Sequence, residues 1–226
     1  MTDASIEMSK ALHASNKAYG LADAYKMKTS LKGQLEIPKA IRCTSEFLFI
    51  NSILDYGTGK GGLVSLLKSY EDLGGINIQG FDPAVEEFSK RPDQKFDIVT
   101  CIDVLEHIDR DSIGEVINDI GNLVDSFLFF AIDLRPAQKI LADGRNAHIL
   151  LAPSDWWAQQ ISARFSNTRF IQVGETSSGS RAPAHLFGWA SNDHLAHKAA
   201  NCFIDSIEIL QKRWVLVDGE TYKLKA

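Results

Sequence analysis

A glycine-rich turn between two apolar segments restricts the fold of this chain more than any other feature. Residues 53–55 (I-L-D) have the composition of a strand that ends in a carboxylate, and four glycines then fall within the six residues 57–62. Leucines resume at helical spacing over residues 63–67. This order of strand, glycine turn and helix is typical of α/β sheets that bind nucleotides, because glycine lets the backbone approach a ligand closely and a helix start offers free N–H groups.

The spacing of the glycines distinguishes three kinds of nucleotide site. A phosphate-binding P-loop requires Ser or Thr directly after Gly-Lys, and Gly61 stands there instead. Gly57, Gly59 and Gly62 satisfy the dinucleotide pattern G-x-G-x-x-G, which keeps NAD open as a ligand. A third pattern, D-x-G-x-G-x-G, is met in full from Asp55 to Gly61. Its carboxylate attracts a cationic amino group and repels a pyrophosphate, although a tight turn without a ligand remains an alternative.

Asp82 is the second candidate contact to a nucleotide. It follows the predicted strand 76–81, 21 residues after Gly61, and a carboxylate at this place can accept both hydroxyls of a ribose. Pro83 would then flank the adenine, while the alternative role of Asp82 is to cap a helix. Phe96 comes only 14 positions after Asp82, so we expect the third strand of the fold to be reduced or absent.

Two further apolar segments, residues 96–102 and 127–132, have the continuous pattern of strands that are buried on both faces. A helix with a regular apolar stripe is predicted between them. The carboxyl ends of parallel strands lie at one edge of a sheet, where open α/β sheets bind ligands. This edge would collect four polar side chains: Asp103, Glu106, His107 and Asp133.

Three motifs together resemble the class I S-adenosylmethionine-dependent methyltransferases. They are I-L-D-Y-G-T-G-K-G, G-F-D-P-A and F-D-I-V-T-C-I-D-V-L-E-H-I, in family order over residues 50–135. The later segments D-L-R-P-A-Q-K-I-L-A-D-G-R-N-A-H (residues 133–148) and P-S-D-W-W (residues 153–157) are similar to a small bacterial and phage subgroup of these enzymes with unassigned substrates. The resemblance implies S-adenosylmethionine as cofactor, bound by these residues: Asp55, Gly57, Gly59, Gly61, Asp82, Pro83, Ile102 and Asp103.

We therefore expect an α/β fold with a Rossmann-like, doubly wound, mostly parallel sheet. The last strand should be antiparallel and the third strand reduced, with a helical lid before the sheet and a helix plus hairpin after it. The expected boundaries are 1–46 for the lid, 47–192 for the methyltransferase core domain and 193–226 for the C-terminal extension. That extension is also a candidate homodimer contact.

The methyl acceptor should bind at the same edge of the sheet. The polar, Gly- and Pro-punctuated loop 135–148 is the main candidate, because loops at this edge carry specificity; a solvated surface loop is the alternative. The candidate substrate residues are Tyr19, Asp133, Arg135, Arg145, Asn146 and Trp156.

His107 and His148 are the candidate catalytic bases, because an imidazole can take the proton of a hydroxyl or amine acceptor. Each also has a plain structural alternative, as a helix-start or a loop histidine. The string D-x-x-E-H resembles the metal-binding E-x-x-E-H of small-RNA 2′-O-methyltransferases and some ubiquinone-pathway O-methyltransferases. Asp103, Glu106, His107 and His148 could hold Mg²⁺ or Mn²⁺, but metal-free relatives also carry E-H here, and we predict no metal.

Composition limits the partners. The formal charge of −5 over 226 residues disfavours a long nucleic acid. Three cysteines without metal spacing, no signal peptide and no membrane span predict reduced cysteines in a cytoplasmic protein. The leading function is methyl transfer (EC 2.1.1) to a small-molecule or glycan acceptor, at oxygen. The alternatives are a NAD-dependent oxidoreductase and a catalytically silent cofactor-binding protein.

Overall fold

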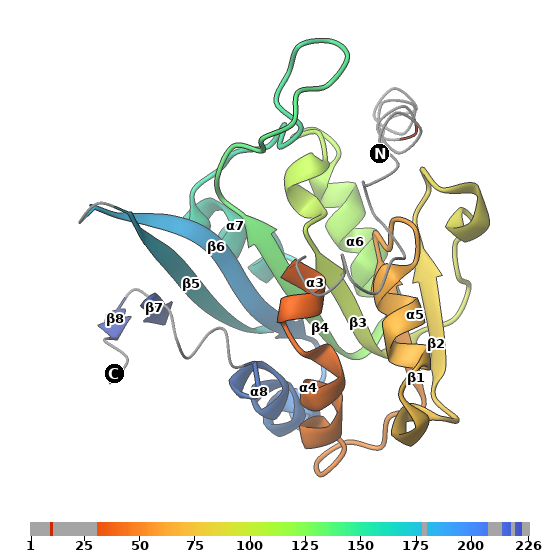
Figure 1. The fold of residues 1–226 in the computed structure, drawn as a ribbon. Coiled ribbons are helices and arrows are strands. Elements are labelled where there is room, and N and C mark those ends of the chain that lie inside the picture. Colours follow the sequence, from red (N-terminus) through yellow and green to blue (C-terminus); the bar gives the residue numbers. More distant parts are fainter. Residues whose placement is uncertain (1–9, 11–30, 178–179, 208–213, 218–219, 223–226) are drawn as a thin grey trace.

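The computed structural model describes residues 10, 31–177, 180–207, 214–217 and 220–222 (Figure 1). Its centre is one eight-stranded sheet with the strand order β2-β1-β3-β4-β6-β5-β7-β8. In chain order the strands are β1 (Ser52–Tyr56), β2 (Asn77–Phe81), β3 (Phe96–Ile102), β4 (Val124–Asp133), β5 (Asn167–Ser177), β6 (Ser180–Ser191), β7 (Trp214–Val217) and β8 (Glu220–Tyr222).

The strand directions confirm the predicted fold class. The pairs β2/β1, β1/β3 and β3/β4 are parallel, and β6 pairs antiparallel with β4. β5 pairs antiparallel with β6, so it runs in the same direction as β4. The sheet is therefore Rossmann-like and mostly parallel by strand direction, with β6 as the antiparallel last strand of the core.

β3 has the predicted bounds, and its residues explain why it lies in the middle of the sheet. Ile98 and Ile102 pack on one face of the sheet, whereas Val99 and Cys101 pack on the other. All four side chains are fully buried. A strand that packs on both faces has no polar face to alternate, which gives the continuous apolar run seen in the sequence.

The third strand of the usual fold is absent from residues 82–95, all of which the structure describes. Only the short 3₁₀ helix η2 (Glu86–Phe88) lies between β2 and β3. β2 is consequently the edge strand on this side of the sheet. The prediction from chain length is confirmed, because too few residues are present for a crossover and a strand.

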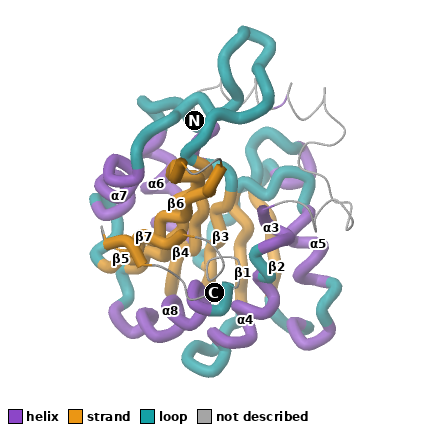
Figure 2. Tube along the Cα trace, turned by 60° about the vertical axis from the view of Figure 1, so that its left-hand side comes forward, coloured by secondary structure: helices purple, strands orange, loops and turns teal. Residues whose placement is uncertain are grey.

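Helices cover both faces of the sheet (Figures 1 and 2). One face carries α3 (Leu31–Gln34), α4 (Ile37–Thr44), α5 (Gly62–Lys68) and α8 (His197–Asp205), and the other carries α6 (Ile113–Leu123) and α7 (Ser154–Ser162). Of the predicted lid, only Lys10 and residues 31–46 are described. Within that part, α4 buries Ile37 and Ile41 in the core. It therefore forms part of the core layer.

The C-terminal extension has the predicted helix and hairpin. The helical pattern of the sequence runs over residues 193–213, whereas α8 follows the 3₁₀ helix η4 (His194–Ala196) and ends at Asp205. Ser206 donates its hydroxyl to the Cys202 carbonyl at 2.7 Å, and Ile207 turns into the core. The hairpin β7–β8 extends the sheet beyond β5. Among the described helices, none has the length and apolar character needed to cross a bilayer.

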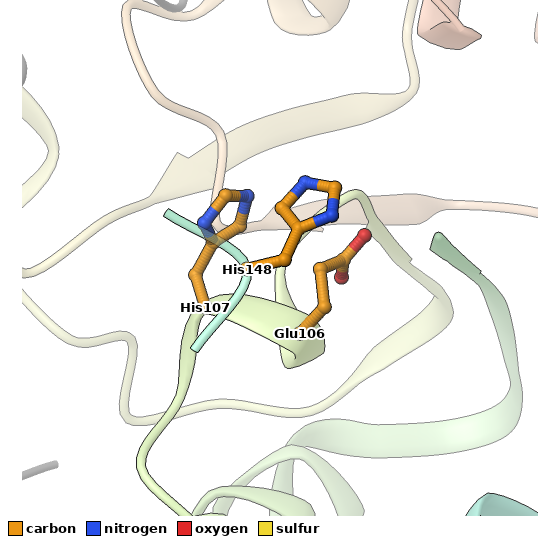
Figure 3. Close-up of side chains that lie close together, drawn as sticks. All are labelled: Glu106, His107 and His148. Carbon is orange, nitrogen blue, oxygen red and sulfur yellow. The ribbon is translucent and has the colours of Figure 1, made fainter. Parts of the chain in front are cut away.

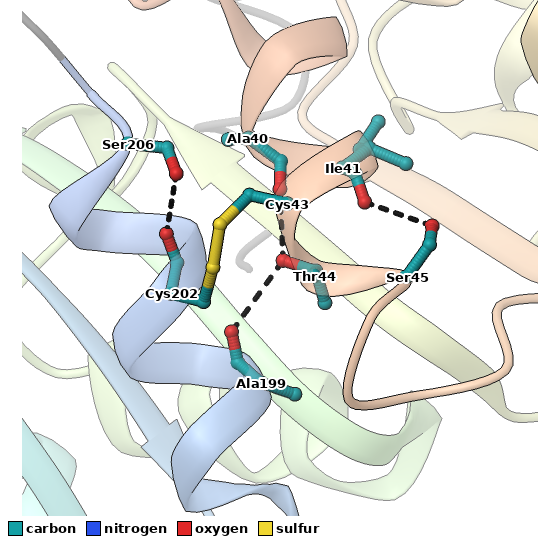
Figure 4. Close-up of a disulfide and its surroundings, with 8 residues drawn as sticks. All are labelled: Ala40, Ile41, Cys43, Thr44, Ser45, Ala199, Cys202 and Ser206. Carbon is teal, nitrogen blue, oxygen red and sulfur yellow. Dashed lines mark hydrogen bonds between the residues drawn. A yellow bond between two sulfur atoms is a disulfide. The ribbon is translucent and has the colours of Figure 1, made fainter.

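A disulfide joins α4 to α8 (Figure 4). Cys43 and Cys202 are 159 residues apart in sequence, and their Cα atoms are 6.0 Å apart. The Thr44 hydroxyl also reaches the Ala199 carbonyl at 3.4 Å. The expectation of three reduced cysteines is therefore wrong for this pair, because sequence spacing does not show that the two helices pack together. Cys101 is free, and burial raises the pKa of its thiol above the ordinary value.

Candidate functional site

In the turn that follows β1, three glycines occupy positions that do not suit a side chain. Gly57, Gly59 and Gly61 have φ angles of 72°, 59° and 74°, in the left-handed region that favours glycine. A Cβ atom on Gly57 would lie 2.3 Å from a methyl group of Val104, and one on Gly61 would lie 2.5 Å from the Phe88 ring. The sequence folds this way because only glycine fits these positions. The result is a bare backbone cradle at the carboxyl edge of the sheet.

Asp82 ties this cradle to the end of β2. Its carboxylate accepts the backbone N–H groups of Gly59 and Ala84, both at 2.9 Å, and only 9% of the residue is exposed. The Phe81 carbonyl accepts the N–H groups of Gly57 and Thr58. Each Asp82 oxygen uses one acceptor position for the backbone and keeps another for a ligand. Asp82 therefore braces the turn and can still accept hydroxyl groups.

Asp55 is fully buried at the end of β1 and is paired with a lysine. Lys32 of α3 places its Nζ atom 3.1 and 3.0 Å from the two carboxylate oxygens, and 3.0 Å from the Gly57 carbonyl. The Thr100 hydroxyl donates to the same carboxylate at 3.1 Å. Sequence reasoning missed Lys32, because it is 23 residues upstream on a separate helix and no motif includes it.

The remaining cofactor candidates lie beside the cradle in different ways. Pro83 is half-buried directly after Asp82. The Ile102 side chain is fully buried in the core, so only its backbone can line a ligand. Asp103 is exposed, with φ at 61°, and its N–H donates to the Ala131 carbonyl at 2.9 Å. Val104 closes one wall of the turn through its methyl contact near Gly57.

Three side chains converge at the same edge of the sheet: Glu106, His107 and His148 (Figure 3). One ligand atom of each lies within 4.8 Å of the other two. Glu106 and His107 come from the 3₁₀ helix η3 (Leu105–His107), whereas His148 comes from the loop that follows β4. The end of this loop is held next to η3, because the Leu150 N–H donates to the Glu106 carbonyl at 3.0 Å.

Both imidazoles are oriented by backbone carbonyls. His107 Nδ1 lies 2.8 Å from the Ala147 carbonyl, and His148 Nδ1 lies 2.6 Å from the Arg135 carbonyl. A carbonyl can only accept, so each Nδ1 carries the proton and each neutral ring keeps a lone pair on Nε2. The arrangement presents two proton acceptors, or two metal ligands, at one place.

Glu106 is the buried member of this cluster. Its Oε1 atom accepts the Asp133 N–H at 2.7 Å, and its Oε2 atom is without a hydrogen-bond partner among the described residues. Burial, followed by the negative charge of Asp103, raises the pKa of Glu106 well above its ordinary value. The carboxyl group is therefore held toward its neutral form unless a cation binds beside it.

The cluster fits a divalent cation in the chemistry of its donors. Two imidazole nitrogens and one carboxylate oxygen make up the set, and the carbonyl contacts at Nδ1 are the supporting contacts that metal-binding histidines use. Of the four ligands considered from the sequence, three form the converging group, and the exposed Asp103 lies outside it.

A second polar group surrounds Asp133 at the end of β4. Arg135 donates Nε and an Nη atom to the Asp133 carboxylate, both at 3.0 Å, and the same Nη atom lies 3.2 Å from Nε2 of His185. Burial acts to raise the pKa of Asp133, but the hydrogen bonds from Arg135 outweigh it, so the pKa lies below the ordinary value. His185, on β6, was missed because its strand is distant in sequence.

The two loop candidates Asn146 and Arg145 differ in the groups that they contact. Asn146 uses its amide within the loop, accepting from Ala137 N–H and His148 N–H at 2.9 Å each and donating to the Ala137 carbonyl. Arg145 is exposed and pairs with Asp143 at 2.7 Å. Asn146 thus supports His148, while Arg145 also lies 3.7 Å from the Asp109 carboxylate, outside the loop. Tyr19 lies outside the described residues.

Two observations place the rest of the loop and Trp156. Burial, followed by the charge of Lys60, lowers the pKa of Lys139 in this loop. Trp156 is half-buried on α7, where Arg110 stacks over its ring at 4.7 Å. Its neighbour Trp157 is fully buried in the core.

Comparisons with known proteins agree with this geometry. The profile of a family described as "Methyltransferase domain" matches residues 20–173, more than half of the chain. Among solved structures, the plantazolicin methyltransferase in complex with a desmethyl-plantazolicin analogue and S-adenosylhomocysteine has a TM-score of 0.51 and 14% identity, covering 83% of this chain and 98% of that one. That likeness shows the fold.

Two further solved structures are similar at lower scores. The N-methyltransferase NodS from Bradyrhizobium japonicum WM9 has a TM-score of 0.49 at 12% identity, over 82% of this chain and 97% of that one. Magnesium protoporphyrin IX methyltransferase from Synechocystis PCC 6803 has a TM-score of 0.47 at 14% identity, over 80% and 91%. No curated protein matches the chain by sequence.

Proposed function

Because the chain belongs to the methyltransferase-domain family and uses S-adenosylmethionine, we propose that it methylates an oxygen atom of a small-molecule or glycan acceptor. One observation carries this choice. His107 and His148 lie close to each other and to Glu106 at the carboxyl edge of the sheet, and the carbonyl contact at each Nδ1 leaves Nε2 as the proton acceptor of a neutral ring. A hydroxyl acceptor needs a base to take its proton, and these nitrogens can serve.

The cofactor is assigned to the cradle by the fit of its parts. Asp82 has acceptor positions for the ribose hydroxyls, and Pro83 is placed to flank the adenine. Asp55 and the Gly57 carbonyl suit the ammonium of the amino-acid end. When bound, the cofactor supplies a methyl group that its sulfonium already activates. The task left to the protein is to align the acceptor oxygen with that methyl group, at roughly 3 Å.

We assign the acceptor to the region between the Glu106, His107 and His148 cluster and the polar group around Asp133. Arg135, which Asp133 holds in two hydrogen bonds, can bind a polar or anionic part of the acceptor. Its backbone carbonyl also orients His148, so one residue links acceptor binding to the base. Asn146 acts on this site through the loop, as a brace for His148.

Two histidine variants test the role of the bases. We expect His107→Gln or His148→Gln to lower kcat by roughly 10²- to 10⁴-fold, with unchanged affinity for S-adenosylhomocysteine. The acceptor is first found by incubating the protein with labelled methyl donor and fractionated small molecules from a lysate. His194→Gln, an exposed histidine on η4, is the matched control. Full activity in both test variants would contradict the assignment.

Metal-assisted transfer is the second candidate, favoured by the unpartnered, buried Oε2 atom of Glu106. Glu106, His107 and His148 would hold the cation, which would supply a Lewis acid for the acceptor oxygen. We expect a bound divalent metal in elemental analysis that is lost in His148→Ala. If EDTA leaves methyl transfer unaffected and His148→Ala leaves metal content unchanged, this candidate fails.

A further inference from the structure

We propose that Lys32 is a built-in competitor for the amino group of the cofactor. In the free enzyme its ammonium fills the subsite at Asp55 and Gly57, and it must leave when the cofactor binds. The proposal rests on the proposed function in one respect, which is the placement of the amino-acid end of the cofactor at Asp55.

The acceptors around Lys32 are the first argument. An ammonium has three N–H donors, and Lys32 Nζ has three oxygen atoms around it: both oxygens of Asp55 and the Gly57 carbonyl, at 3.0 to 3.1 Å. The α-ammonium of an amino acid has the same charge and the same three donors. Lys32 uses all three of these oxygen atoms. The Lys32 ammonium and the α-ammonium of the cofactor therefore cannot occupy this subsite at the same time.

Burial is the second argument. The Asp55 side chain has no exposed surface, and that of Lys32 is 15% exposed. Water therefore screens this pair weakly, and a second cation beside Lys32 would be repelled strongly. One carboxylate can neutralise one cation here, because the other neighbour of Asp55 is the neutral Thr100 hydroxyl.

The position of Lys32 in the chain is the third argument. It belongs to α3, a helix of four residues, which the bend at Glu36 separates from α4. Glu36 has a φ of 48°, and Leu35 is fully buried, so the chain is anchored just after α3. α4 itself is bonded to α8 through Cys43. Lys32 can withdraw by rotating its long side chain while this anchored layer stays in place.

Calorimetric titration of the full chain tests the proposal with two ligands. S-adenosylhomocysteine carries the ammonium, and 5′-methylthioadenosine lacks the whole amino-acid end. We expect Lys32→Met to bind S-adenosylhomocysteine about tenfold tighter than the wild type, and to bind 5′-methylthioadenosine within about twofold of it. Lys68→Met, an exposed lysine in the last turn of α5, should change neither affinity. Weaker binding of S-adenosylhomocysteine by Lys32→Met, or an equal change for both ligands, would overturn the competition.

A second measurement uses the wild-type protein, so it does not depend on how the variant folds. Acetic anhydride labelling of Lys32, read by mass spectrometry, should rise several-fold with S-adenosylhomocysteine and stay unchanged with 5′-methylthioadenosine. Protection of Lys32, or an unchanged signal, by S-adenosylhomocysteine would overturn the proposal. If neither ligand binds the wild type, the placement of the cofactor fails as well, which separates that failure from failure of the competition alone.

Discussion

At the scale of single residues, the buried acidic side chains determine the properties of the site. Glu106 is fully buried and accepts a single N–H group through Oε1. The raised pKa of Glu106 has a consequence for stability. Above the ordinary pKa of a glutamate the unfolded chain has released its proton while the folded protein still holds it, so stability falls as pH rises toward the raised pKa.

Glu106→Gln removes this pH dependence and keeps an oxygen for the Asp133 N–H. In a buffer with chelator at pH 8, we expect the variant to be more stable than the wild type by about 1–3 kcal/mol, and the gap to close toward pH 5. Urea denaturation at a series of pH values measures this. Glu115→Gln, on the exposed side of α6, should show no such trend. A gap that widens toward low pH would contradict the raised pKa.

In the glycine turn, by contrast, we predict that a substitution destabilises the protein. Gly57→Ala should lower the free energy of unfolding by about 1–3 kcal/mol and weaken S-adenosylhomocysteine binding, because its Cβ meets Val104 and its φ is positive. Thermal unfolding and calorimetry report the two effects. The control is Gly114→Ala, a helical position with open space around it, which should be neutral or slightly stabilising. An unimpaired Gly57→Ala would show that the turn tolerates a side chain.

At the scale of elements, the sequence pattern predicted those helices and strands whose bounds depend on their own residues. Strand β3 has the predicted bounds, since all of its residues except the partly buried Asp97 agree with burial on both faces. The missing third strand followed from chain length. The end of α8 did not, because it depends on Ile207 turning into a core that other segments build. Lys32 and His185 were missed for the same reason, as only tertiary packing brings them to the site.

The link between α4 and α8 is an element-scale feature with a direct test. Cys43→Ser should lower the free energy of unfolding by about 2–5 kcal/mol, because the disulfide restricts a long segment of the unfolded chain. Dithiothreitol should lower the melting temperature of the wild type to that of the variant, and it should leave the melting temperature of the variant unchanged. If titration under denaturing, non-reducing conditions finds three free thiols, the two helices are not linked in the purified protein.

At the scale of the whole molecule, the sheet order brings distant segments to one edge. Asp55, Asp82 and Asp133 end three different strands, and Glu106 and His148 join them from the segments that follow β3 and β4. The motifs in the sequence predicted the cofactor half of this site, because a short contiguous turn makes it. The proposed acceptor site draws on loops and on β6, so no single motif in the sequence identifies the acceptor.

The most direct test of the central claim is a paired calorimetric titration of the full chain with S-adenosylhomocysteine and with NAD. We expect S-adenosylhomocysteine to bind at one site per chain, NAD to give no binding heat, and Asp82→Ala to weaken S-adenosylhomocysteine by at least about tenfold. Binding of NAD without binding of S-adenosylhomocysteine, or an Asp82→Ala variant with undiminished affinity, would contradict the claim that this cradle holds the methyl donor.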